Sequence, residues 1–331
     1  MNIKSSIKDY SVQFNDNFAQ SLNSVYNQGD IIIIDNKVYS SLLKNYKCIK
    51  LDISEKSKEF SNISNILHDI IGNFNKTNKL IAIGGGITQD ITGFIASIIF
   101  RGVNWVFFPT TLLAQGDSCI GGKTSINFNS FKNQLGNFYP PNQVFICNDF
   151  LSTLPNNAVN SGLGEMLHFF LVSGVKDYNF FIKNKNNISK LVKRCLQIKK
   201  LYVEIDEFDK KERLILNYGH TFGHAIEAVT DNKIEHGVAV SMGMDIANYI
   251  SYRKKYITLD VFENIQKNLV MIYKNITLPD IDKLIRALEK DKKNISNKLN
   301  CVLTKGPGNM FLEEVEYKHI IQYLNEYNAI K

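Results

Sequence analysis

The sequence lacks any pair of cysteines at the short spacing of a metal-binding or redox motif. Its five cysteines are scattered over 331 residues, at positions 48, 119, 147, 195 and 301. Dispersed thiols of this kind do not form the disulfide framework on which small secreted proteins depend. We therefore expect reduced, mostly buried cysteines in a cytoplasmic protein.

Long apolar runs and blocks of like charge are also missing. The longest apolar stretch, residues 91–113, is interrupted by Arg101 and Pro109, so it does not suit a membrane span. Residues 1–20 lack the apolar core of a signal peptide. The net charge of +7 comes from dispersed basic residues. This pattern predicts no membrane or nucleic-acid partner, and it is compatible with an anionic small-molecule substrate.

The pattern of apolar segments divides the chain near residue 154. Before that point, short apolar runs such as residues 31–34 and 80–83 alternate with helical patterns such as residues 88–100. Strands separated by helices are typical of a parallel sheet. The sequence predicts a Rossmann-like α/β domain over residues 1–153. Further strands are expected at 46–53 and 105–108, and a further helix at 55–71.

Amphipathic helices dominate the second part of the chain. They are expected at residues 158–173, 188–205, 212–229, 237–252, 259–273 and 281–290. Two short strand patterns, at 300–304 and 310–315, flank Gly306-Pro307-Gly308 and predict a hairpin. Residues 154–331 should therefore form a mostly α-helical domain.

Three of the six histidines lie in one short window of this helical part. His220 and His224 are four residues apart and would share a helix face, while His236 begins the next helical pattern. Glu165 lies upstream, directly after the glycine-containing segment Gly162-Leu163-Gly164. Imidazole together with a carboxylate suits zinc, and three protein ligands would leave one position open for catalysis. From spacing alone, a pair of helix-surface histidines without a metal is an equally open interpretation.

Glycines mark a candidate phosphate site in the first part of the chain. Gly84-Gly85-Gly86 follows an expected strand and precedes an expected helix, where backbone amides and the helix dipole favour a pyrophosphate. Asp90, in the first turn, could accept a hydrogen bond from a ribose. The segment is not a GxGxxG fingerprint, and a tight turn without a ligand explains the glycines equally well.

A second glycine pair, Gly121-Gly122, precedes Lys123 and Thr124. Its backbone amides and the lysine suit an oxyanion. The spacing is not that of a Walker A loop, so it does not predict an ATPase. Each lysine here could equally be part of an ordinary solvent-exposed surface.

In order and spacing, these segments resemble the sugar phosphate cyclase family. The matched pieces are Gly84 to Gly86 with Asp90, residues 101–103, 109–115, 117–124, 132–133, 136–140, 153–155, 162–165, 216–228, 236–237 and 291–293. They cover roughly residues 30 to 305, and their agreement is more specific than any single motif.

The resemblance implies an NAD-binding first domain, a helical domain that binds Zn²⁺ or Co²⁺, and a homodimer. By position, the metal ligands would be Glu165, His220 and His236. NAD would be held by Asp35, Glu55, Lys58, Gly85, Gly86, Asp90, Thr110, Thr111, Lys132 and Thr153. The substrate would be bound by Arg101, Lys123, Asn133, Lys199, Arg213, Asn217, His224 and one of Lys292 or Lys293. The catalytic groups would be Asp117, Lys123, His168, Lys199, His220 and His224. Arg101 would act near the site of the neighbouring subunit.

The reaction that the resemblance implies is a lyase reaction followed by ring closure. NAD would oxidise the substrate transiently, phosphate would leave by β-elimination, the hydride would return, and an intramolecular aldol reaction would close the ring. Arg213, Asn217 and His224 favour a substrate with a carboxylate. This indicates conversion of 3-deoxy-D-arabino-heptulosonate 7-phosphate to 3-dehydroquinate, a step of the shikimate pathway.

Three residues depart from the family pattern. Gln89 stands where the family usually has glycine, Gly116 where it commonly has valine, and His168 where it has an active-site lysine. These departures leave open a divergent cyclase that uses another sugar phosphate. A metal-dependent polyol dehydrogenase would share the two-domain plan, and a catalytically inactive metal-binding or assembly protein would share the histidine cluster.

Overall fold

The computed structural model describes residues 1–72, 74–129, 131–289 and 297–330. They divide into two compact units. The first unit is Met1–Leu154 with Lys199–Phe208, and the second is Pro155–Ile198 with Asp209–Lys331. None of the helices among the described residues combines the length and the apolar character that a membrane span requires.

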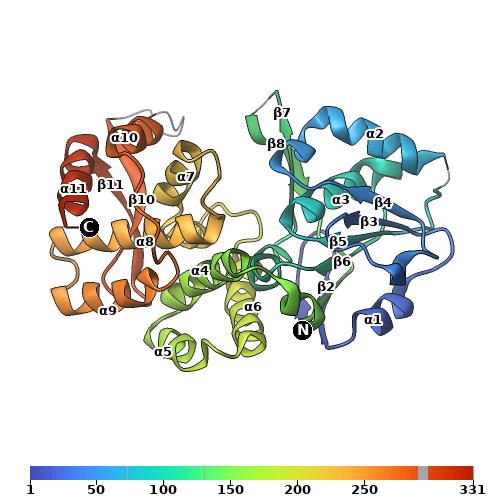
Figure 1. Ribbon diagram of the computed structural model, residues 1–331, viewed down its shortest axis with the longest axis horizontal. Helices are drawn as coiled ribbons and strands as arrows, with labels where there is room; N and C mark the ends of the chain where they lie inside the picture. The colour runs from blue at the N-terminus through green and yellow to red at the C-terminus, as the bar shows by residue number, and fades with distance from the viewer. Residues whose placement is uncertain (73, 130, 290–296, 331) are drawn as a thin grey trace. The chain divides into compact units, whose positions relative to one another are not determined.

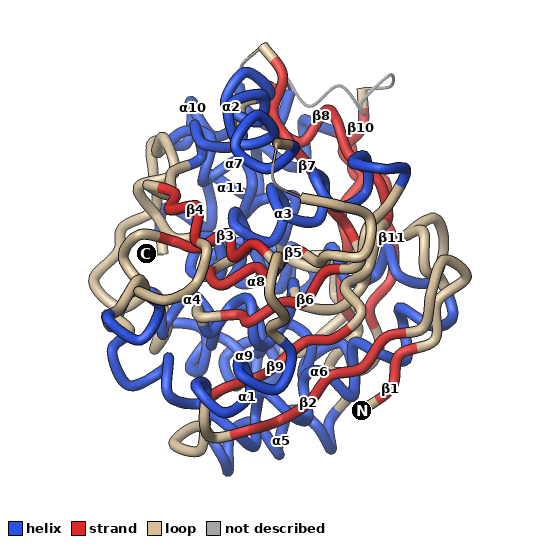
Figure 2. The backbone as a smooth tube through the Cα atoms, turned by 90° about the vertical axis from the view of Figure 1, so that its right-hand side faces the viewer, coloured by secondary structure: helices blue, strands red, loops and turns tan. Residues whose placement is uncertain are grey.

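The described part of the first unit contains a seven-stranded sheet in the order β1-β2-β9-β6-β5-β3-β4 (Figure 2). Every neighbouring pair is parallel except β1 with β2. The strands are β1 (Asn2–Ile3), β2 (Tyr10–Asn15), β3 (Ile31–Asp35), β4 (Cys48–Leu51), β5 (Leu80–Gly84), β6 (Trp105–Pro109) and β9 (Gln143–Cys147). The expectation of a mostly parallel α/β sheet is confirmed.

The central strands are apolar on both faces because helices cover both faces. Ile32 and Ile34 of β3 point to one face, where α1 (Phe18–Val25) packs Phe18 and Leu22 against them. Helix α3 (Gly86–Ile98) packs against β3, β5 and β6, and α2 (Phe60–Ile71) packs beside α3. Continuous apolar strands are the signature of a parallel sheet buried in this way.

The strand order reverses direction between β3 and β5. From β3 the chain moves to β4 on one side, whereas from β5 it moves to β6 on the other side. Open parallel sheets bind ligands at such a switch point, outside the carboxyl ends of the strands. At this edge β3 ends at Asp35 and β5 ends at Gly84.

A hairpin of β7 (Lys123–Phe128) and β8 (Phe131–Phe138) lies outside the main sheet. The sequence patterns did not predict it, because β8 is almost entirely exposed and has no apolar periodicity. Gly136 permits the pairing, since a Cβ atom there would lie 2.1 Å from the carbonyl oxygen of Thr124.

The second unit is built around α8 (His236–Arg253), in which residues 237–251 are all buried. Helices α4, α7, α9 and α11 pack on it, and Figure 1 shows α8 running through the unit. The bounds are α4 (Asn156–Ser173), α5 (Val175–Asn184), α7 (His220–Val229), α9 (Leu259–Val270), α10 (Ile281–Glu289) and α11 (Tyr317–Ala329). Helix α6 (Ile188–Ile205) begins in this unit, and its residues 199–205 belong to the first unit. A mostly helical second domain is confirmed, and β10 (Lys298–Thr304) pairs with β11 (Met310–Glu316) as the expected hairpin.

Helices α4 and α8 touch through backbone atoms. A Cβ atom on Gly164 would lie 2.2 Å from the carbonyl oxygen of Gly237, and a Cβ on Gly237 would lie 1.8 Å from that of Ser161. Only glycine at both positions permits this approach, because real Cβ contacts are never so short.

The prediction of one helix over residues 212–229 is wrong. A short 3₁₀ helix (Glu212–Asn217) ends before Tyr218, and α7 starts afresh at His220. Gly219 has φ +83°, a left-handed conformation that glycine adopts without strain, and it turns the chain between the two helices. The helix predicted over residues 55–71 is likewise interrupted, since Glu59 is extended (φ −61°, ψ 136°) between a 3₁₀ turn (Glu55–Lys58) and α2.

Candidate functional site

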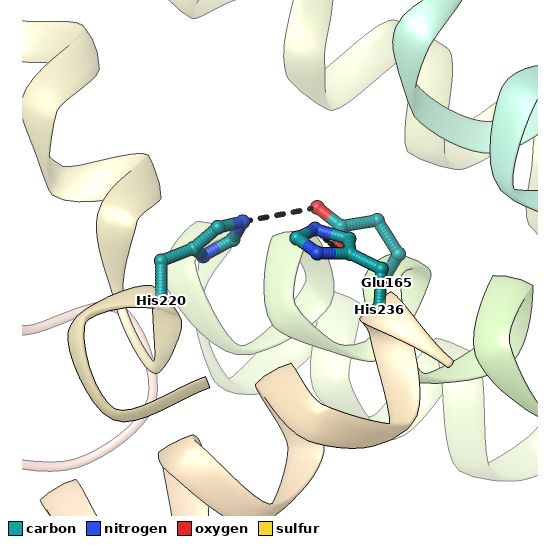
Figure 3. A group of neighbouring side chains, drawn as sticks. All are labelled: Glu165, His220 and His236. Atoms are coloured by element: carbon teal, nitrogen blue, oxygen red, sulfur yellow. Dashed lines mark ion pairs between the residues drawn. The ribbon is translucent and has the colours of Figure 1, made fainter. Parts of the chain in front are cut away.

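Three side chains from three helices of the second unit point toward one another (Figure 3). Glu165 lies on α4, while His220 and His236 are the first residues of α7 and α8. Nε2 of His220 is 3.7 Å from Oε1 of Glu165, and Nε2 of His236 is 3.5 Å from Oε2. All three ligand atoms lie within 4.8 Å of one another.

These separations fit a shared cation better than direct hydrogen bonds. Two ligands at 2.0–2.1 Å from a tetrahedral metal ion are about 3.4 Å apart. Hydrogen bonds between nitrogen and oxygen are shorter, at about 2.7–3.2 Å. The donor set of one carboxylate and two imidazoles matches the preferences of Zn²⁺ and Co²⁺.

The other ring nitrogen of each histidine is held by a hydrogen-bond acceptor. Nδ1 of His236 lies 3.1 Å from Oε2 of Glu227, and Nδ1 of His220 lies 3.3 Å from the carbonyl oxygen of Tyr218. An N–H group donating from Nδ1 leaves Nε2 as the lone-pair nitrogen. In both rings this nitrogen faces Glu165, as in metal sites in which outer partners orient the ligands.

Glu227 received no role from the sequence, although its position carried a signal. It lies seven residues after His220 on α7, and therefore on the same helix face. A carboxylate so placed can reach a histidine ligand from the neighbouring helix.

The electrostatic surroundings keep His220 neutral. Burial lowers the pKa of His220 well below its usual value, and the neighbouring imidazoles of His168, His236 and His224 lower it further. A neutral imidazole is the form that binds a metal ion.

His168 lies beside the ligand set, one helical turn after Glu165. Its side chain is fully buried, its Nδ1 is 3.8 Å from Oε1 of Glu165, and its ring centroid is 5.2 Å from that of His220. His168, which departs from the family pattern, therefore lies beside two of the expected metal ligands, Glu165 and His220.

Three further residues expected to bind the substrate lie on α7 and on the 3₁₀ helix that precedes it. His224 is exposed on α7, with its ring centroid 5.4 Å from that of His220 and 5.7 Å from that of His236. Arg213 is buried on the 3₁₀ helix before α7. Asn217, at the end of that helix, donates from Nδ2 to the carbonyl oxygen of Leu214 at 3.0 Å.

Expected NAD-binding residues of the first unit gather at the carboxyl end of its sheet. Asp35 ends β3, and Gly85 and Gly86 begin α3 after β5. Thr110 follows β6 and donates its backbone N–H to the carbonyl oxygen of Gly84 at 2.9 Å. A Cβ on Gly85 would lie 3.1 Å from Cγ2 of Thr111, so the turn is narrow.

The remaining members of this set lie on the segments that follow the other strands. Glu55 and Lys58 are on the 3₁₀ turn that follows β4, and Thr153 ends the 3₁₀ segment (Asn148–Thr153) that follows β9. Lys132 is exposed on β8 of the hairpin.

Asp90, on α3, forms an ion pair with Lys58 at 2.7 Å. Burial raises the pKa of the Asp90 carboxyl, and Lys58 opposes that rise.

Asp117 and Lys199, both expected catalytic residues, form an ion pair. Nζ of Lys199 is 2.7 Å from Oδ1 of Asp117 and also donates to the carbonyl oxygen of Asp117 at 2.7 Å.

Lys123 is exposed at the start of β7. Arg101 is exposed in a turn whose left-handed φ of 63° continues that of Phe100 at 50°. Lys292 and Lys293 lie outside the described residues.

Gln89, the second departure from the family pattern, has a structural partner in the first unit. Its Nε2 donates to the carbonyl oxygen of Ser118, and its Oε1 accepts from the Ser118 hydroxyl, both at 2.7 Å. Gln89 therefore braces the short helical turn (Ala114–Ser118) that also carries Gly116 and Asp117.

Comparisons with known proteins agree with this geometry. The family model for the 3-dehydroquinate synthase N-terminal part matches residues 48–161, and the model for the C-terminal part matches residues 162–294. A 3-dehydroquinate synthase of Dictyoglomus turgidum is 35% identical over 335 residues, which cover 97% of this chain and 91% of the relative. The chain belongs to the 3-dehydroquinate synthase family. The resemblance inferred from its motifs is confirmed.

Solved structures of related enzymes share the fold of this family member. A 2-deoxy-scyllo-inosose synthase, crystallised with carbaglucose-6-phosphate, NAD⁺ and Co²⁺, has a TM-score of 0.89 at 26% identity and covers 98% of this chain and 99% of its own. Glycerol dehydrogenase from Schizosaccharomyces pombe has a TM-score of 0.60 at 15% identity, with 97% and 89% covered. That second likeness concerns the fold alone.

Proposed function

We propose that the chain is a 3-dehydroquinate synthase that depends on NAD and a divalent metal ion. It would convert 3-deoxy-D-arabino-heptulosonate 7-phosphate to 3-dehydroquinate and phosphate. The observation that carries the proposal is the approach of Nε2 of His220 and Nε2 of His236 to the two oxygens of Glu165, at 3.7 and 3.5 Å. Membership of the family supports the choice of reaction.

In this proposal the second unit holds the metal and much of the substrate. Glu165, His220 and His236 supply one carboxylate and two neutral imidazoles to the cation. When bound, a divalent cation at these residues would supply the charge that lowers the pKa of a substrate alcohol, and NAD would supply the hydride acceptor. Arg213 pairs with the substrate carboxylate through two parallel N–H groups, and His224 donates to phosphate oxygens.

The first unit binds NAD in the same proposal. The backbone amides of Gly85 and Gly86, at the start of α3, donate to the pyrophosphate, where the helix dipole adds attraction. Asp35 and Glu55 accept hydrogen bonds from ribose hydroxyls. Thr110, Thr111, Lys132 and Thr153 complete the cofactor set as the family pattern implies. Asp117, Lys123 and Lys199 act on the substrate, with Lys123 neutralising phosphate charge.

A second candidate is a divergent cyclase that acts on another sugar phosphate. His168 favours it, because a buried imidazole replaces a longer, charged lysine next to Glu165 and His220. An imidazole reaches less far than a lysine and donates fewer hydrogen bonds.

The deciding experiment incubates the purified chain with the heptulosonate phosphate, NAD and Zn²⁺, and measures phosphate and 3-dehydroquinate. Equal amounts of both products are expected, with no net NADH. Turnover of a different sugar phosphate in a panel, without 3-dehydroquinate, would select the divergent cyclase. Net NADH formed from glycerol would instead select a polyol dehydrogenase.

The proposal includes a cytoplasmic homodimer in which Arg101 acts near the neighbouring subunit's site. The exposure of Arg101 is compatible with this role. Sedimentation at equilibrium should give twice the chain mass. In mixed dimers of an Arg101→Ala chain with a chain inactivated by His220→Ala, one site of each dimer lacks both defects when Arg101 acts across subunits, and activity is then restored.

A further inference from the structure

The two residues before His220 form a tight turn to which no role has been assigned. Tyr218 has φ −57° and ψ 121°, and Gly219 has φ 83° and ψ −23°. These are the angles of a type II β-turn, which requires a positive φ at its second central residue. The peptide between the two residues carries the Tyr218 carbonyl oxygen, which lies 3.3 Å from Nδ1 of His220.

The Tyr218 carbonyl decides which nitrogen of His220 is free. A carbonyl oxygen can only accept, so Nδ1 carries the proton and Nε2 keeps its lone pair. The contact is at the long end of N–H to O hydrogen bonds, which are mostly about 2.7–3.2 Å, so a small displacement of the turn would break it. The contacts that fix the turn therefore also fix the orientation of the His220 ring.

The side chain of Tyr218 fastens the turn to α8. Tyr218 and Asn248 are both fully buried, and the Tyr218 hydroxyl donates to Oδ1 of Asn248. This bond joins the residue that carries the carbonyl oxygen to the helix that begins with the second histidine, His236.

The backbone of Gly219 rests on the same helix. A Cβ atom on Gly243 would lie 2.0 Å from the carbonyl oxygen of Gly219, and a Cβ on Gly219 would lie 2.5 Å from Cγ of Met244. Met244 and Asn248 are four residues apart and share a face of α8. The turn is thus held on α8 at two points, of which only the Tyr218 hydroxyl can be removed without changing the backbone.

The pair of Tyr218 and Asn248 is not the choice that stability alone would favour. Nδ2 of Asn248 is buried and has no hydrogen-bond partner within the described ranges. A buried donor without a partner destabilises the folded state, whereas two apolar side chains of similar shape would leave nothing unpaired. What the hydrogen bond adds is position, because it admits one arrangement of the two side chains.

We propose that Tyr218 and Asn248 are positioning residues for the metal ligand His220. Their hydrogen bond holds the turn where the Tyr218 carbonyl oxygen accepts from Nδ1, so that Nε2 is presented to the cation. This inference rests on the proposed function, whose metal dependence it extends from the ligands to the residues behind one of them.

The test compares Tyr218→Phe with the double variant Tyr218→Phe/Asn248→Leu, which leaves no unpaired polar group at this position. Zn²⁺ affinity is measured by competition with a chelating dye, and the melting temperature is measured on the metal-free chain. Both variants should bind Zn²⁺ about tenfold more weakly than the native chain, as expected for loss of a group that orients a metal ligand. The double variant should nevertheless melt at or above the native temperature.

Co²⁺ gives a second readout of the same site. The visible absorption of bound Co²⁺ depends on the positions of its ligands, so a displaced His220 ring should change the spectrum in both variants. A merely structural role of Tyr218 would leave the spectrum of the Co²⁺-saturated chain as it is in the native protein.

Ser251→Ala is the matched control, because Ser251 is also fully buried on α8. Its hydroxyl donates to the carbonyl oxygen of Ala247 at 2.8 Å and accepts from the backbone N–H of Thr304, on β10, at 3.1 Å. The variant should lower the melting temperature and leave the Zn²⁺ affinity and the Co²⁺ spectrum unchanged.

Two outcomes would overturn the proposal. The first is native Zn²⁺ affinity in the double variant. The second is an equal loss of affinity in Ser251→Ala, which would assign the effect to a general loss of stability. A native chain that binds no Zn²⁺ would overturn this proposal together with the proposed function, whereas one that binds Zn²⁺ but forms no 3-dehydroquinate would overturn the proposed function alone.

Discussion

Nδ1 of His236 and Oε2 of Glu227 lie 3.1 Å apart, so a carboxylate on α7 orients a metal-ligand candidate on α8. Removing the negative charge should leave the ring less well oriented and its Nε2 less basic. We expect Glu227→Gln to weaken Zn²⁺ binding about 10- to 100-fold, measured by competition with a chelating dye.

Two further variants serve as controls for the Zn²⁺-binding measurement. His220→Ala removes a ligand and should abolish both tight binding and turnover. Glu263→Gln changes an exposed glutamate on α9 and should bind Zn²⁺ as the native chain does. Unaltered affinity in Glu227→Gln would mean that His236 needs no outer partner.

A second prediction concerns His168. Its buried ring occupies the place of a family lysine, beside Glu165. We expect His168→Lys to retain turnover of the heptulosonate phosphate, at or above the native rate, because the longer side chain restores the family's donor. His168→Ala, which supplies no donor, should be slower than either. The assay is kcat and KM for phosphate release; loss of activity in the lysine variant alone would show that the imidazole is required.

A third prediction concerns an ion pair between α5 and α6 in the second unit. Nε and Nη2 of Arg194 donate to the two oxygens of Asp177 at 2.7 and 2.9 Å. Burial by itself would raise the pKa of Asp177, but hydrogen bonds from Arg194 and Ser173 outweigh it, and the net pKa is lowered. A lowered carboxyl pKa stabilises the fold above the unfolded-state value, about 3.9, and this contribution disappears as pH falls through the folded value.

Arg194→Gln should therefore destabilise the fold by about 1 kcal/mol at pH 7, a modest figure because the arginine is partly exposed. The difference from the native chain should shrink as the pH drops below about 4. Urea unfolding at several pH values measures it. A difference that stays constant with pH would assign the loss to packing of the arginine stem.

The cysteines give a fourth prediction. Cys48 is partly exposed, whereas the other four thiols are buried. Burial raises the pKa of Cys147 to about 11 and those of Cys119 and Cys301 to about 12. Iodoacetamide at pH 8 should therefore label Cys48 first in the folded chain and all five only after unfolding, as peptide mass spectrometry would show. Early labelling of Cys119 would contradict the burial.

The sequence was sufficient where residue type alone decides the structure. A short isoleucine run such as β3, bounded by turn residues, favours a buried strand. The resemblance, rather than the spacing of the histidines alone, singled out Glu165, His220 and His236 as ligand candidates, and the structure brings these three side chains together. Contacts distant in sequence could not be read in this way. Exposed β8 lacks an apolar pattern, and its Asn133 accepts a hydrogen bond from Lys58, which lies 75 residues upstream.

Backbone conformation was the other limit. Leu214, Tyr218 and Phe222 recur every four residues, which is the spacing of one continuous helix. Only the left-handed φ of Gly219 ends it, and many helices tolerate an internal glycine. Without that turn His220 would not begin a helix.

The close approach of α4 and α8 has a consequence for the chemistry nearby. Gly164 precedes Glu165, and Gly237 follows His236, so the glycines that let the two backbones touch are the sequence neighbours of two metal-ligand candidates. The absence of a Cβ atom at these two glycines therefore sets the distance between the backbones that carry Glu165 and His236. An alanine at either glycine would push α4 and α8 apart without removing any of the candidate ligand atoms. Substitutions that weaken zinc binding should therefore include positions whose side chains do not contact the ion.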